Sequence, residues 1–185
     1  MQQTINIPKF LHEVHGKQAT LTDVILAHAF AAVITTLTLY WSMAMDMPVI
    51  KMIVLGILAY DLSGGVLANF SKGTSIHYAA SAKARRNFLL LHILQPTMMV
   101  YLFQGNDLVL VALSAYIVLG SFWVNAQPTA IRQLRWGAFL SLSGITLLFI
   151  PGLQLSAVQQ MLLVFFMLKL PLAFAVQWYK LAEEG

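Results

Sequence analysis

Residues 48–70 read PVIKMIVLGILAYDLSGGVLANF, and this stretch decides the fold class. A helix needs about 20 mainly apolar residues to cross the hydrocarbon core of a bilayer. The stretch is long enough to do so, and its second half carries one acidic residue, Asp61. We therefore predict a transmembrane helix that holds a carboxyl group inside the membrane.

The whole chain shares this character. Of its 185 residues, 59% are hydrophobic and 10% are charged, whereas an ordinary soluble domain has about 25% charged residues. A soluble fold of this size could not bury so much apolar surface. The composition excludes a soluble enzyme, a disordered chain and a nucleic-acid-binding domain. The chain has no cysteine, which also excludes disulfides and thiolate metal sites.

Short polar breaks divide the chain into apolar segments of membrane-spanning length, and only the connection at 71–85 is long. We predict an all-α protein: an integral membrane bundle of six transmembrane helices, in a single domain at 21–181. The predicted spans are 22–43, 48–70, 86–104, 107–126, 132–150 and 155–179.

The N-terminal segment, residues 1–20, carries apolar residues at the spacing of one helix face: Ile7, Phe10, Leu11 and Val14. This spacing predicts a short amphipathic helix at 7–15 that precedes the bundle. Such a helix would lie on the cytoplasmic membrane surface or pack across the end of the bundle. Residues 182–185 are predicted to form a short cytoplasmic tail.

The basic residues set the orientation, because cytoplasmic loops carry an excess of Lys and Arg. The opposite loops hold only Lys51, which lies near the end of a span. We therefore expect both termini in the cytoplasm, in a bacterial inner membrane. The residues on the predicted cytoplasmic side are Lys9, Lys17, Lys72, Lys83, Arg85, Arg86, Arg132, Arg135 and Lys180.

Four ionisable residues fall inside the predicted spans: His28, Asp61, His92 and Lys169. Each is expensive in a bilayer unless it is paired or hydrated. At a rise of ~1.5 Å per residue, all four lie roughly 9 to 15 Å from the cytoplasmic ends of their helices. We predict that they form one catalytic constellation, with His28, Asp61 and His92 around a pocket. Lys169 would lie at its deep end, paired with Asp61.

Small and polar residues suggest how a ligand would be held beside this constellation. Gly64 and Gly65 either make room for a ligand next to Asp61 or form a packing seam between helices. Asn69, Arg85 and Arg86 are expected at the cytoplasmic mouth of the pocket, where they would hold an anionic head group. Gln95 lies one turn beyond His92, and we include it among the substrate-binding candidates.

Two prolines are expected to disturb the predicted spans. Pro96 and Pro171 each remove a backbone N–H, which leaves the carbonyls of His92 and Met167 without their helical donors. A kink is therefore expected beside His92, and another near Lys169.

Three functions fit these residues, and whether the protein is an enzyme is left open. The first is a membrane-embedded enzyme that acts on a lipid or another apolar substrate by Asp/His acid–base chemistry. A divalent metal could assist, with His28, Asp61, His92 and His77 as candidate ligands. The second is a proton-coupled transporter or channel that uses an Asp–Lys–His relay. The third is an electron-transfer protein that binds haem b through His28 and His92.

The expected partners follow from the composition and the predicted six-helix bundle. Membrane lipids surround the chain, nucleic acid is not expected to bind, and a homo-oligomer fits a bundle that is too small to enclose a transport path alone. A non-catalytic partner subunit of a larger complex also stays open.

Overall fold

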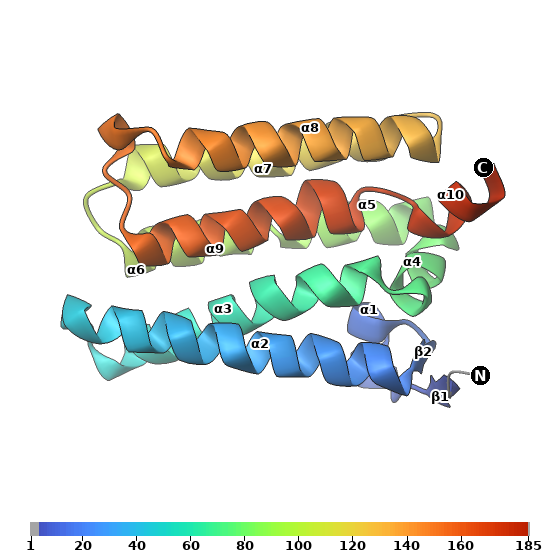
Figure 1. Cartoon of the computed structure of the whole chain (residues 1–185), viewed down its shortest axis with the longest axis horizontal. Helices are drawn as coiled ribbons and strands as arrows, with labels where there is room; N and C mark the ends of the chain where they lie inside the picture. Colours follow the sequence, from blue (N-terminus) through green and yellow to red (C-terminus); the bar gives the residue numbers. More distant parts are fainter. Residues whose placement is uncertain (1–3, 185) are drawn as a thin grey trace.

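Long helical passes lie side by side along the long axis of the molecule and alternate in direction (Figure 1). The computed structural model describes residues 4–184, with side chains described as far as Leu181. Within this range the passes are α2 (Leu21–Ser42), α3 (Val49–Phe70), α5 (Ala82–Leu91) followed by α6 (Leu94–Leu102), α7 (Asp107–Asn125), α8 (Ala130–Leu148), and α9 (Ala157–Met167) continued by η4 (Leu168–Phe174).

Shorter elements join these passes. The two ends of the described chain, together with α4 (Lys72–Ala79) and α10 (Trp178–Glu184), lie at the same end of the bundle (Figure 1). The remaining short turns are η2 (Met43–Met45) and η3 (Pro151–Leu153). The shared end matches the prediction that both termini lie on one side, and it is the end that carries most of the basic residues.

Four helices in the described part of the chain are long and apolar enough to cross a membrane: Leu21–Met45, Val49–Phe70, Asp107–Asn125 and Ala157–Phe174. The predicted span at 86–104 is broken into α5 and α6 at His92 and Ile93, so the predicted kink is confirmed. The predicted span at 132–150 corresponds to α8, which is long enough but less apolar. The last predicted span is shorter than expected, because the helix ends at Phe174 and α10 is separate.

The outward faces of the passes are strongly apolar. Leu108 is 83% exposed, Val49 76% and Leu119 68%. Apolar patches of this extent are rare on soluble monomers and indicate contact with a membrane or a partner. Together with the four span-length helices, they identify an integral, multi-pass membrane protein.

The helix formed by α9 and η4 is the central one. It contacts α3, α7 and α8, and Leu162, Phe166 and Leu170 on it are fully buried. Its start is fixed by a capping box, in which Ser156 accepts from the backbone N–H of Gln159 and the Gln159 side chain accepts from that of Ser156. Lys169 is therefore carried by the most buried helix of the bundle.

The N-terminal cap, residues 4–20, closes one end of the bundle. Strands β1 (Thr4–Asn6) and β2 (Gln18–Thr20) pair antiparallel, with η1 (Lys9–Leu11) and α1 (His12–His15) between them. The helical part is thus shorter than the predicted 7–15, and the strand pair was not predicted. Phe10 is 81% exposed, so the predicted apolar residues do not form one buried face. The cap packs across the end of the bundle, against α3 and α4.

Two glycines allow the cap to dock on α4. Gly16 has φ +75°, a conformation that favours glycine, and a Cβ there would overlap the carbonyl of Gly73. A Cβ on Gly73 would overlap the backbone carbonyls of Gln18 and His15. The two backbones can therefore approach, and the Thr74 hydroxyl donates to the carbonyl of Val14 at 2.7 Å.

Candidate functional site

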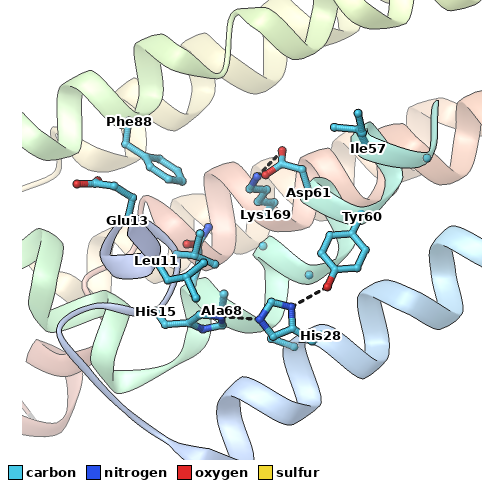
Figure 2. Close-up of a pocket in the computed structure, with 16 residues that line it drawn as sticks. Leu11, Glu13, His15, His28, Ile57, Tyr60, Asp61, Ala68, Phe88 and Lys169 are labelled. Atoms are coloured by element: carbon cyan, nitrogen blue, oxygen red, sulfur yellow. Dashed lines mark hydrogen bonds and ion pairs between the residues drawn. The ribbon is translucent and has the colours of Figure 1, made fainter. Parts of the chain in front are cut away.

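A pocket of about 500 Å³ lies between the N-terminal cap and helices α2, α3, α5 and η4 (Figure 2). One face of α3 forms much of its wall, from Gly56 to Asn69. The lining is mainly apolar, yet two separate groups of ionisable side chains reach it. The first is centred on Asp61 and the second on His28.

Asp61 and Lys169 form an ion pair at the pocket wall. The Lys169 ammonium donates to Asp61 Oδ2 at 2.8 Å, and the Gln95 amide donates to the same oxygen at 3.0 Å. The predicted Asp61–Lys169 contact is confirmed. The Lys169 side chain is 3% exposed and that of Asp61 48% exposed, so the carboxylate faces the pocket while the ammonium is enclosed by protein.

The two predicted glycines make room for protein groups rather than for a ligand. A Cβ on Gly65 would overlap the Cε of Lys169, so this glycine lets the lysine cross α3 to reach Asp61. A Cβ on Gly64 would lie 2.9 Å from the Cβ of Ala31, so this glycine allows α2 and α3 to pack closely. Both still line the pocket, but the packing seam is the better explanation for Gly64.

Lys169 lies in a π-helical turn, η4, which is a rare helix type that is frequent at functional sites. Pro171 lies inside it and provides no backbone N–H. The Ser141 hydroxyl donates to the carbonyl of Met167 at 2.9 Å, which satisfies the group predicted to be free. Pro171 therefore accounts for the irregular turn, and the hydrogen bond from Ser141 stabilises it.

Arg85 and Arg86 do not lie at the mouth of the pocket. Arg85 is 4% exposed, and its guanidinium donates to the carbonyls of Phe174 and Ala175 and to the side chain of Asn125. It therefore caps the end of η4. Arg86 is exposed and is not among the pocket-lining residues.

A chain of hydrogen bonds forms the second ionisable group. The Tyr60 hydroxyl and His28 Nδ1 are 2.7 Å apart, and His28 Nε2 and His15 Nε2 are 3.1 Å apart (Figure 2). These residues come from α3, α2 and α1. Burial and the neighbouring His28 lower the pKa of His15, partly offset by Asp23, so neutral His15 is favoured.

The sequence analysis did not identify two of these three hydrogen-bonded residues, His15 and Tyr60. Tyr60 directly precedes Asp61, and this was the one available signal for it. For His15 the sequence offers no signal, because nothing local indicates that the cap folds back onto the bundle.

His92 lies near this site but is not a lining residue of the pocket. It is 5% exposed, its Nδ1–H donates to the carbonyl of Phe88 at 2.7 Å, and its ring packs on Phe88. The predicted convergence therefore joins His28 and Asp61 in one pocket and leaves His92 behind the Phe88 ring.

His77 also lies outside the pocket. Its Nε2 is 3.8 Å from Glu13 Oε1, and Glu13 Oε2 accepts from the Tyr78 hydroxyl at 2.6 Å. Burial and the bond to Glu13 raise the pKa of Tyr78 well above its usual range. Glu13 lines the pocket, so α4 holds this carboxylate in place.

The candidate metal ligands do not come together in one group, and the two candidate haem ligands lie in different surroundings. Among residues 4–184, no group of three or more His, Asp or Glu side chains is placed to hold a metal ion. His28 has both ring nitrogens in hydrogen bonds, and His92 lies in a separate environment. The four candidate metal ligands therefore lie in three separate places. His28 and Asp61 line the pocket, His92 lies behind Phe88, and His77 lies beside Glu13.

The comparisons with known proteins give no relative: no family model, curated protein or solved structure matches this chain.

Proposed function

We propose that six segments cross the membrane, with both termini in the cytoplasm. Two passes would join the four span-length helices: α8, and α5 with α6 in tandem. The alternating directions of the passes support this arrangement (Figure 1). The basic residues at the end that carries the cap and α10 support the orientation.

Reporter fusions test this topology. A fusion after Gly105 is expected to report an extracytoplasmic position, and a fusion after Gly185 a cytoplasmic one. An extracytoplasmic C-terminus would contradict the proposed orientation. Equal reporter activity at the two sites would contradict an odd number of crossings between them.

We further propose that the chain is a membrane-embedded enzyme that acts on a lipid or another apolar molecule. One observation carries this proposal: a mainly apolar pocket of about 500 Å³ receives two hydrogen-bonded ionisable groups. His28 lies seven residues after the start of α2, roughly 10 Å along the helix. Asp61 lies nine residues before the end of α3, roughly 13 Å. The pocket would therefore open in the inner leaflet.

The two groups have complementary chemistry. Tyr60 and His28 are in hydrogen-bond contact and can exchange a proton, and His15 extends this path into the cap. Asp61 is fixed by Lys169 and Gln95, so it offers an oriented carboxylate to a molecule in the pocket. In an apolar site from which water is excluded, fixed charges of this kind act strongly on developing charge.

A second candidate function is proton-coupled transport. The hydrogen-bonded chain of His15, His28 and Tyr60 favours it, because proton transfer along such a chain needs no metal or cofactor. An assay of lipid conversion together with an assay of proton leakage separates the two functions.

The purified protein is incubated with an apolar extract of the host membrane, and the extract is compared before and after by mass spectrometry. We expect conversion of at least one component by wild type. Asp61→Asn and Tyr60→Phe should each slow it at least about 100-fold, a usual size for loss of an acid–base group. The exposed variant Lys83→Gln should match wild type. If no component changes while the protein dissipates a pH gradient across liposomes, the transporter is correct and the enzyme proposal fails.

A further inference from the structure

Two polar side chains that line the pocket have a nitrogen atom without a partner among the described residues, and this indicates what the pocket binds. We propose that it selects an uncharged amphiphile whose head carries a hydrogen-bond-accepting oxygen, such as an ester or ketone carbonyl, over an anionic lipid. This inference deepens the proposed function and rests on the same pocket. It replaces the anionic head group expected from Arg85 and Arg86, since neither residue lines the pocket.

The first unpartnered donor is the side-chain amide of Asn69. Asn69 lines the pocket and is 4% exposed. Its Nδ2 has no hydrogen-bond partner among the described residues. Buried polar groups are nearly always hydrogen-bonded, so this donor calls for an acceptor in the pocket.

The second unpartnered group is Nδ1 of His15. His15 also lines the pocket and is fully buried, and its Nδ1 has no partner among residues 4–184. A phenol is a better donor than an imidazole, which favours Tyr60 as the donor to His28 Nδ1. In that arrangement His28 Nε2 donates to His15 Nε2, and the proton of His15 lies on Nδ1. His15, which lines the pocket, therefore carries a second N–H without a partner among the described residues.

The charge of the lining argues against an anion. Its ionised residues are two carboxylates, Glu13 and Asp61, and one ammonium, Lys169. Lys169 is already paired with Asp61. Glu13 accepts from the Tyr78 hydroxyl and lies 3.8 Å from His77, and no Lys or Arg of the described residues pairs with it. A phosphate or carboxylate head would meet two N–H donors but no unpaired Lys or Arg among the lining residues, and it would lie near the Glu13 carboxylate. A carbonyl or ester oxygen uses the same donors without that repulsion.

The apolar part of the lining provides a place for the tail. Leu11, Val14, Ile57 and Phe88 contribute to it, from the cap, α3 and α5. The proposed ligand thus lies with its head beside Asn69 and His15 and its tail along the face of α3.

The test compares two lipids that share the same acyl chains and adds a quinone as a second neutral probe. The full-length protein in nanodiscs of phosphatidylcholine is offered dioleoylglycerol, dioleoyl phosphatidic acid and a decyl-substituted benzoquinone, and retained lipid is measured by native mass spectrometry. We expect dioleoylglycerol or the quinone to be retained about tenfold more than phosphatidic acid. Asn69→Leu should lower that retention about tenfold, the value of one good hydrogen bond. Glu13→Gln should raise the retention of phosphatidic acid.

A matched control separates binding from folding. Ser114→Ala removes another buried hydroxyl without a partner among the described residues, but Ser114 lies on α7 outside the pocket. It should leave retention unchanged. Asn69→Leu should not lower the melting temperature of the lipid-free protein, because it removes an unsatisfied group.

Three outcomes overturn the proposal. The proposal is wrong if phosphatidic acid is retained as well as the neutral probes or if neither neutral probe binds. It is also wrong if Asn69→Leu leaves retention unchanged, since water would then satisfy the donor. The outcome is independent of catalysis. Selective retention without conversion supports this inference and removes the enzyme proposal, whereas conversion of a phosphate-bearing lipid does the reverse.

Discussion

Replacing Asp61 with asparagine is expected to lower the free energy of unfolding by about 3 kcal/mol, the lower end of the range for breaking a buried pair. Lys169 is almost fully enclosed, so without the carboxylate its ammonium stays buried with no opposite charge. We expect a loss of stability at the lower end of that range because the Asp61 side chain is half exposed. Chemical denaturation in detergent, followed by circular dichroism, measures the change.

The double variant Asp61→Asn/Lys169→Met is the critical comparison. It removes both charges, so it should recover most of the lost stability, since apolar replacements of a buried pair are often neutral. Lys51→Met is the matched control, because Lys51 lies near a helix end and makes two long contacts, 3.4 Å to the carbonyl of Leu102 and 5.2 Å to the ring centroid of Tyr101. If the double variant is as unstable as Asp61→Asn alone, the buried lysine is not the cause.

Replacing Gly73 with alanine is expected to undock the N-terminal cap at a cost of about 3 kcal/mol, the upper end of the usual overpacking range. The new Cβ would meet the backbone carbonyls of Gln18 and His15, and backbone cannot move aside as a flexible side chain can. Undocking also breaks the contacts of Thr74 with Val14 and of Tyr78 with Glu13.

Limited trypsin digestion measures this undocking. Cleavage after Lys9 and Lys17 should become at least about tenfold faster in Gly73→Ala, because those bonds lie in the β1–β2 region that the docked cap orders. Gly152→Ala is the matched control, since a Cβ there meets no atom within 4 Å. Cleavage at the wild-type rate would show that the cap tolerates the extra methyl group and that the two backbones are not closely packed in solution.

Much of the candidate site was predictable, because two of its properties are local. An ionisable residue within a long apolar segment must avoid lipid, so Asp61, Lys169 and His28 could be expected to face the interior. Matched depth on two helices whose charges must avoid lipid then predicts a contact, as the Asp61–Lys169 pair confirms. Glycine next to a carboxylate within a span predicts open space, although the space at Gly65 is filled by Lys169 rather than by a ligand.

The parts that could not be predicted depend on contacts between distant residues. The role of Arg85 at the end of η4 joins residues about 90 positions apart, and the exclusion of His92 depends on the ring of Phe88. The position of His15 against His28 requires the cap to fold back, which follows from the close approach of Gly16 and Gly73.

The sequence by itself determined that this is an apolar helical membrane protein with charges buried at similar depths, because hydropathy and helical rise are properties of each segment alone. Only the tertiary structure decided which polar groups share the pocket and which hold helices together. That choice depends on the rotation of each helix about its axis and on how closely two backbones approach. Packing between segments sets both, and no single segment encodes them.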